Sequence, residues 1–105
     1  MDFVLKKIKR LIIQGNFLFT LKADAERLND GLTQEDVLES ILNASLIRSK
    51  KSHSPWRKER DEKMYIIESF TYDGVLIYTK GVIRKQGPIE TFYIIVSAKK
   101  STFGE

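Results

Sequence analysis

Residues 64–98 read MYIIESFTYDGVLIYTKGVIRKQGPIETFYIIVSA, and this stretch decides the fold. It contains three runs rich in β-branched and aromatic residues: Met64 to Thr71, Val75 to Lys85 and Ile89 to Ala98. Turn-forming residues separate the runs, in Tyr72-Asp73-Gly74 and in Gln86-Gly87-Pro88. The stretch therefore predicts a three-stranded antiparallel meander.

Upstream of this stretch, apolar residues recur with the period of a helix in three segments. The first follows Asp2, a potential N-cap, and ends at Gly15; its apolar stripe is Val4, Ile8, Leu11 and Ile12. The second begins after Thr20 and stops before Gly31; it contains Ala23, Ala25 and Leu28. The third follows a near capping box of Thr33 and Asp36; its stripe is Val37, Leu38, Ile41 and Leu42.

Two shorter segments favour strands. Phe17 to Phe19 is a brief β-favouring run, and after Asn43 the residues Ser45, Ile47 and Ser49 alternate with Leu46 and Arg48. The second strand is expected to run into a basic loop over residues 50–60. Because the helices come first and the sheet afterwards, we expect an α+β fold in which N-terminal helices cover one face of a small antiparallel sheet. At 105 residues the chain is expected to form a single domain over residues 1–105.

The composition is that of a globular protein, with 42% hydrophobic and 30% charged residues. The sequence contains no cysteine, which excludes disulfides and thiolate metal sites and favours a cytoplasmic location. Cations interrupt the apolar residues of positions 1–14, so we expect no signal peptide, and no apolar run approaches the roughly 18–20 residues that span a membrane. The formal charge is 18 − 14 = +4, which favours polyanionic partners.

The segment from Arg48 to Arg60 concentrates positive charge around two ring-bearing residues, His53 and Trp56. Its cations are Arg48, Lys50, Lys51, Arg57, Lys58 and Arg60, and Glu59 alone opposes them. Lysine and arginine clusters bind phosphate backbones, and Trp56 can stack on an unpaired base. The segment therefore predicts binding of single-stranded RNA. The alternative is a solvated loop whose charge keeps the protein soluble.

The residue types available argue against metal or triad chemistry. His53 is the only histidine, no cluster has metal-ligand spacing, and no cofactor is expected. His53 could act as a general base or be a polar surface residue.

Metal-free RNA cleavage needs activation of the 2′-oxygen, stabilisation of the phosphorane charge and protonation of the leaving 5′-oxygen. Tyr78 and Lys80 share one face of a predicted strand, and Lys99 closes the neighbouring strand, so lysine and tyrosine side chains that could supply such chemistry lie there. Of these, Lys80 is expected to bind the RNA. The alternative is that they are ordinary interfacial packing and solvated charge.

The order of several motifs resembles a known superfamily. These motifs are Phe17-Leu18-Phe19-Thr20, Ala25-Glu26, the segment Gly31-Leu32-Thr33-Gln34-Glu35-Asp36-Val37, and the strands that follow. Over roughly residues 5–100 the chain resembles RelE-like toxins of the barnase/EndoU/colicin/RelE superfamily. It is most similar to MqsR-like mRNA interferases and to a related domain family of unknown function.

This resemblance implies a RelE-like fold and a metal-independent endoribonuclease that acts on free or ribosome-bound mRNA and is neutralised by a cognate antitoxin protein. It implies catalytic roles for Tyr78 in Leu76-Ile77-Tyr78-Thr79-Lys80, for Lys99 in Val96-Ser97-Ala98-Lys99, and for Arg48 in place of the family's lysine. The glutamine that the family carries ahead of the next strand has no clear match, because Glu62 and Lys63 occupy that region. The alternatives are a non-catalytic RNA- or protein-binding module on the same fold and a purely protein-binding regulator.

Overall fold

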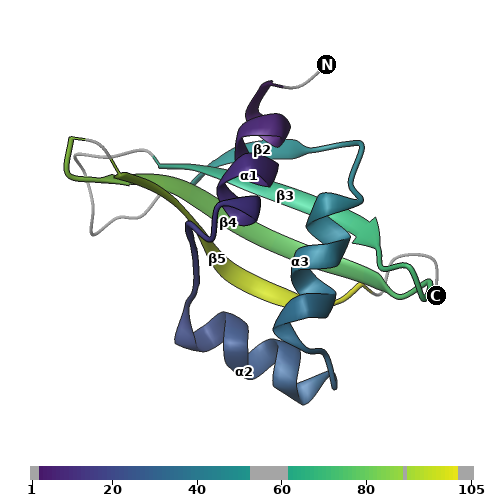
Figure 1. The fold of residues 1–105 in the computed structure, drawn as a ribbon. Coiled ribbons are helices and arrows are strands. Elements are labelled where there is room, and N and C mark those ends of the chain that lie inside the picture. The colour runs from purple at the N-terminus through teal and green to yellow at the C-terminus, as the bar shows by residue number, and fades with distance from the viewer. Residues whose placement is uncertain (1–2, 53–61, 89, 102–105) are drawn as a thin grey trace.

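The computed structural model describes residues 3–52, 62–88 and 90–101 and confirms an α+β fold (Figure 1). The elements in chain order are α1 (Phe3–Ile13), β1 (Phe17–Phe19), α2 (Leu21–Asn29), α3 (Gln34–Leu42), β2 (Arg48–Ser52), β3 (Glu62–Phe70), β4 (Leu76–Gln86) and β5 (Glu90–Lys100). The predicted first cap, Asp2, and the predicted start of the last strand, Ile89, lie outside the described residues. No helix among the described residues is long and apolar enough to cross a membrane.

The sheet has the strand order β1-β5-β4-β3-β2. Strands β3, β4 and β5 form the predicted antiparallel meander, and β2 pairs antiparallel with β3. The prediction of a wholly antiparallel sheet was wrong, because β1 pairs in parallel with β5, and this strand also separates α1 from the other two helices. The parallel register sets Phe17 beside Tyr93 and Phe19 beside Ile95, so both phenylalanines pack against the core.

Strand β2 lies three residues later than predicted. It covers Arg48–Ser52 rather than residues 45–49, so Lys50 and Lys51 belong to the strand and not to a loop. The pairing of Arg48 with Ile66 and of Lys50 with Met64 sets these bounds. Leu46 precedes the strand and is exposed, so the alternation of residues 45–49 did not mark a buried face.

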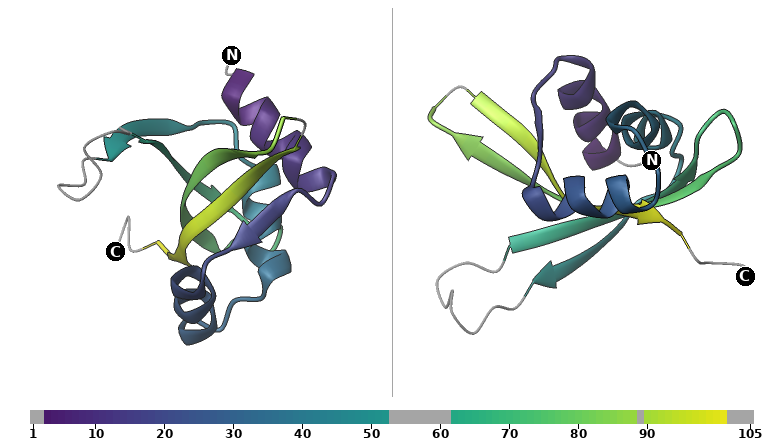
Figure 2. Two further views of the ribbon diagram at one scale, coloured as in Figure 1. Left: turned by 90° about the vertical axis from the view of Figure 1, so that its left-hand side faces the viewer. Right: turned by 90° about the horizontal axis from the view of Figure 1, so that it is seen from below.

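Helices α1 and α3 cover one face of the sheet, whereas α2 lies along the edge formed by β5 (Figure 2). The capping box at the start of α3 is confirmed: Asp36 N donates to Thr33 Oγ1 over 3.0 Å, and Thr33 N donates to Asp36 Oδ2 over 2.9 Å. The core between helices and sheet consists of Leu5, Ile8, Leu11, Ile12, Ala23, Val37, Ile41, Ala44, Ile67, Tyr93, Ile95 and Ala98.

A β-bulge in β5 changes which residues face the helices. Lys80 pairs with Ser97, but the next residue of β4, Gly81, pairs with Ile95, so Val96 is an additional residue in β5. Before the bulge, the odd-numbered Tyr93 and Ile95 belong to the core. After it, the even-numbered Ala98 does, and Ser97 and Lys99 lie on the opposite face of the sheet.

The ring of Tyr93 occupies the space above Gly81, beside the bulge. A Cβ atom at Gly81 would lie 2.8 Å from Cε1 of Tyr93 and closer still to its Cζ and Oη. Tyr93 is fully buried, and no described residue hydrogen-bonds to its hydroxyl. Burial, together with the neighbouring Tyr65, raises the pKa of Tyr93. Because a Cβ atom at position 81 would overlap the Tyr93 ring, the packing of β4 against β5 requires a glycine there.

The carboxylates of Glu26 in α2 and of its C-cap, Asp30, accept hydrogen bonds from the edge of β5 where β1 has ended. The Ala98 amide donates to Glu26 over 3.1 Å, and the Lys100 amide donates to Asp30 over 2.8 Å. Four residues of a helix rise about 6 Å and two residues of a strand about 6.6 Å, so the two spacings match. Glu26 also accepts from Ser97 Oγ over 2.6 Å. Helix α2 thereby replaces the missing part of β1.

We expect Gly81→Ala to lower the free energy of unfolding by about 1–3 kcal/mol, because the new methyl group overlaps the buried ring of Tyr93. Urea denaturation followed by circular dichroism measures this loss. Tyr93→Phe is the matched variant: it removes only the unsatisfied hydroxyl, so stability should be unchanged or higher by about 1 kcal/mol. Equal stability of Gly81→Ala and wild type would contradict the close contact.

We expect Glu26→Gln to destabilise the protein at neutral pH by about 1–2 kcal/mol. Burial acts to raise the pKa of Glu26, but the hydrogen bonds from Ser97 and Ala98 and the charges of Lys22 and Lys99 outweigh it, so the pKa lies below its ordinary 4.5. The ionised carboxylate therefore stabilises the fold above pH 4.5, and this contribution disappears as the pH falls through the lowered pKa. The stability gap between wild type and variant should narrow on acidification, with Glu35→Gln as the control for net charge. A gap that is constant with pH would refute this role.

Candidate nucleic-acid interface

The bulge brings Tyr78 and Lys99 together on the side of the sheet that does not face α1 and α3, which we call the site face. Tyr78 and Lys99 are cross-strand partners, and Lys99 Nζ lies 5.6 Å from the centroid of the Tyr78 ring. Lys80 lies two residues along β4, on the same face, opposite Ser97. The structure thus gathers a phenol and two ammonium groups on two neighbouring strands, while their functional roles stay a prediction.

Lys80 is the half-buried cation of this group. Burial lowers the pKa of Lys80 below its ordinary 10.5, and the positive charges of Lys50, Lys22 and Lys99 lower it further, while Glu26 acts in the opposite direction. These neighbours come from three different strands or helices besides β4. Lys80 is therefore the centre of a cluster of like charges and holds its proton less tightly than a surface lysine.

Glu26 and Lys22 of α2 belong to the site, although the sequence assigned them no role. The two side chains lie one helical turn apart, with Lys22 Nζ 3.9 Å from Glu26 Oε2. Glu26 also accepts the hydrogen bond from buried Ser97, the cross-strand partner of Lys80. The available signal was the Ala25-Glu26 pair, which is one of the motifs that carry the family resemblance.

Arg48 lies on the site face but is already paired. Its Nη2 atom donates to Glu68 Oε1 over 2.7 Å, and the other oxygen of Glu68 accepts from Ser101 Oγ over 2.7 Å. The Arg48 side chain is 63% exposed. Its guanidinium can therefore reach a ligand only by sharing or leaving Glu68.

The remaining predicted cations of β2 point in two directions. Lys50 pairs with Met64 and lies on the site face with Arg48, whereas Lys51 pairs with Lys63 and points to the other face. The structure therefore separates Lys51 from the cluster. The other predicted RNA-binding residues, His53, Trp56, Arg57, Lys58 and Arg60, lie outside the described residues.

A buried apolar strip runs beside the cluster on the site face. It consists of Ile66, Val82 and Ile94. Val82 and Ile94 are cross-strand partners, and Ile66 of β3 lies opposite Lys80. These side chains are at most 8% exposed, so the cations lie over a packed apolar layer rather than beside an open apolar surface.

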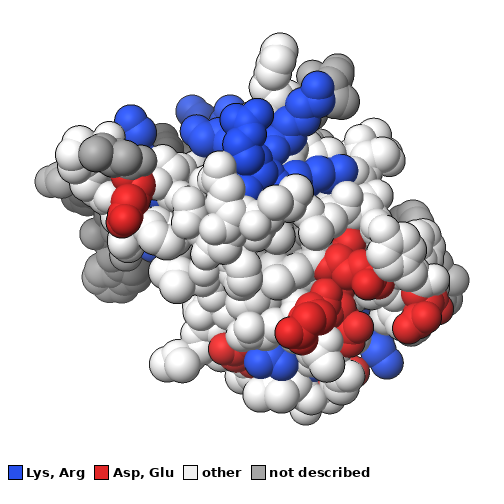
Figure 3. All heavy atoms as spheres, viewed as in Figure 1, with Lys and Arg blue, Asp and Glu red and all other residues white. Residues whose placement is uncertain are grey.

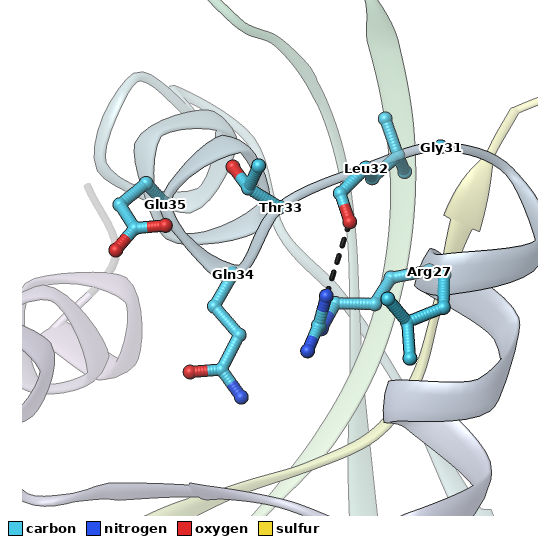
Figure 4. Close-up of a pocket in the computed structure, with 7 residues that line it drawn as sticks. Arg27, Gly31, Leu32, Thr33, Gln34 and Glu35 are labelled. Carbon is cyan, nitrogen blue, oxygen red and sulfur yellow. Dashed lines mark hydrogen bonds between the residues drawn. The ribbon is translucent and has the colours of Figure 1, made fainter.

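A pocket of about 510 Å³ lies elsewhere, at the turn between α2 and α3 (Figure 4). It is lined by Arg27, Leu28, Gly31, Leu32, Thr33, Gln34 and Glu35, none of which was a predicted site residue. Arg27 donates to Asp24 over 2.8 Å and to the carbonyl of Leu32 over 3.1 Å, so its charge is compensated within the chain.

In the described ranges there is also no group of three or more His, Cys, Asp or Glu residues that could hold a metal ion.

Compared with models of known protein families and with curated proteins, the chain matches none of them.

Proposed function

We propose that the protein is a metal-independent endoribonuclease of the toxin type, and that it cleaves RNA on the site face. The observation that carries this proposal is the clustering of Tyr78, Lys80 and Lys99 on neighbouring strands with Lys50 and Lys22 in electrostatic range. The family resemblance supplies the finer part of the proposal: mRNA as the target, a cognate antitoxin as the partner, and the cytoplasm as the place of action.

The site residues can divide the reaction among themselves. The 2′-hydroxyl gives its proton to a base and its oxygen bonds to phosphorus; the bond to the 5′-oxygen breaks, and that oxygen receives a proton. Lys80 suits the base, since its lowered pKa increases the fraction of neutral amine. Lys99 stabilises the negative charge of the phosphorane, and the Tyr78 hydroxyl protonates the leaving oxygen. Arg48 and Lys50 hold the neighbouring phosphates.

The second candidate is a non-catalytic RNA-binding module on the same fold. The pairing of Arg48 with Glu68 favours it, because one of the three predicted catalytic residues is engaged inside the protein. Binding without cleavage, in magnesium-free buffer with and without ribosomes, would support this reading and reject the endoribonuclease.

We expect the double variant Tyr78→Phe, Lys99→Ala to lose RNA cleavage by about 10²–10⁴-fold, because it removes the proposed acid and one charge at the phosphorane. Single-turnover cleavage of a labelled RNA measures the loss, and growth after induced expression reports toxicity. The control Tyr72→Phe, Lys85→Ala removes the same groups from exposed positions outside the site. Equal cleavage by the site variant and the control would reject this site.

We expect the cleavage rate to rise with pH and to level off below pH 10.5, the ordinary pKa of lysine, because neutral Lys80 is the proposed base. Lys22→Gln removes a nearby positive charge, so it should raise the pKa of Lys80 and move the rising limb to higher pH. Lys85→Gln is the control at the same net charge. Lys80→Arg should abolish the limb, since arginine keeps its proton throughout this range. An unchanged pH profile in Lys80→Arg would remove Lys80 from proton transfer.

A further inference from the structure

A second cationic surface lies on the other side of the sheet, on the outward face of α1. The helix contains Lys6, Lys7, Lys9 and Arg10 and no acidic residue. Its buried residues, Leu5, Ile8, Leu11 and Ile12, point at the sheet, so the cations point away from it. Figure 3 shows Lys and Arg side chains gathered over α1, while acidic side chains gather over α3 on the same face of the molecule.

Among the described residues, the exposed cations of α1 have no partner of opposite charge. Lys9 donates to the carbonyl of Ala44 over 2.6 Å, which anchors the helix to the end of α3. Elsewhere in the described chain, Arg27, Arg48 and Arg84 form ion pairs with carboxylates, but within the same residues no carboxylate pairs with Lys6, Lys7 or Arg10. Their charge is therefore available to an external anion.

The core packing of α1 determines which anion fits. A helix that enters a membrane surface buries its apolar face in lipid, but the apolar face of α1 already packs in the protein core. The exposed Phe3 lies on the same side of the helix as Lys6 and Lys7, three and four residues away. Ammonium groups beside an exposed aromatic ring match the phosphates and the base faces of a nucleic acid.

We propose that the outward face of α1, formed by Phe3, Lys6, Lys7 and Arg10, is a second RNA-binding surface that holds phosphates of the same RNA that is cleaved on the site face. This inference rests on the proposed function in taking RNA as the ligand. The two surfaces lie on opposite sides of a molecule that measures 39 × 30 × 26 Å. An RNA must pass around this body to touch both, so a long RNA gains avidity that a short one does not.

The length of the RNA therefore distinguishes binding at one surface from binding at both. A stacked strand extends about 3.4 Å per nucleotide, so a six-nucleotide RNA spans roughly 20 Å and cannot reach both, whereas a 60-nucleotide RNA can. Contacts with phosphates release counterions, and each contact adds about 0.7 to the slope of log K against log salt for a single strand. The loss of three contacts should therefore make that slope shallower by about 2.

The test compares the triple variant Lys6→Glu, Lys7→Glu, Arg10→Glu with a control triple, Lys63→Glu, Lys85→Glu, Lys100→Glu, of the same net charge at exposed positions outside α1. The α1 variant should bind the 60-nucleotide RNA about tenfold or more weakly and with the reduced salt slope, and should bind and cleave the six-nucleotide RNA like the control. The triple variant Lys6→Gln, Lys7→Gln, Arg10→Gln should also bind the 60-nucleotide RNA more weakly. It replaces the glutamate variant if charge reversal impairs folding.

Equal affinity and salt slope of the α1 variant and the control for the long RNA would overturn the second surface. The second surface would also be overturned if the α1 variant bound RNA like the control and differed from it only in binding to anionic vesicles or in its oligomeric state, since either result would identify a different partner. If the wild type cleaves neither RNA but the α1 variant binds the long one more weakly, the endoribonuclease proposal fails and the second surface stands. A wild-type protein that binds neither RNA overturns both.

Discussion

The pairing of β4 with β5, with Val96 as an additional residue, is the constraint on which the rest of the structure depends. In a regular strand, residues 93, 95, 97 and 99 would all point to one face. The first two are Tyr93 and Ile95, which the core requires, so an unbroken β5 would turn Lys99 toward the helices and away from Tyr78. The bulge removes this conflict: Tyr93 and Ile95, before it, point to the core, whereas Ser97 and Lys99, after it, point to the site face. Gly81 and the ring of Tyr93 fill the same region and fix the register.

Helix α2 links the edge of the sheet to the electrostatics of the site. Glu26 completes the hydrogen bonding of β5 and also lies near Lys22, Lys80 and Lys99. One carboxylate therefore serves both stability and charge balance. It offsets part of the repulsion within the cluster and so limits how far the pKa of Lys80 falls. Loss of Glu26 would affect the sheet edge and the protonation of the site together.

Local patterns in the sequence predict those parts of the fold that depend on local interactions. The capping box of Thr33 and Asp36, the three long strands, and Ile8, Leu11 and Ile12 of the apolar stripe of α1 follow from residue spacing alone. Leu5, which is buried with them, was not part of the predicted stripe, and Val4 is only partly buried. The parallel pairing of β1 does not, because a three-residue run such as Phe17–Phe19 contains no information about its partner strand. The position of β2 depends on its register with β3, which the alternation of residues 45–49 did not reveal.

The same limit applies to the site. Alternation predicts that Tyr78 and Lys80 share a face, since they lie two residues apart in one regular strand. It does not predict that Lys99 joins them, because that depends on the bulge. Glu26 and Lys22 of α2 lie more than 50 residues before Lys80 in the sequence, and long-range packing alone brings them to the site.

The pairing of Arg48 with Glu68 bears on how the site face could receive RNA. The pair is largely exposed on the arginine side, and exposed ion pairs contribute only about 0–1 kcal/mol. A phosphate group can bind a guanidinium through two charge-assisted hydrogen bonds, so it can compete with the carboxylate for Arg48. In contrast, Lys80 projects from β4 in the middle of the sheet and Lys99 from the neighbouring strand β5, both at positions that the strand register fixes. The site thus combines two cations on a rigid base with one at its margin that can change partner, as the proposed binding of RNA would require.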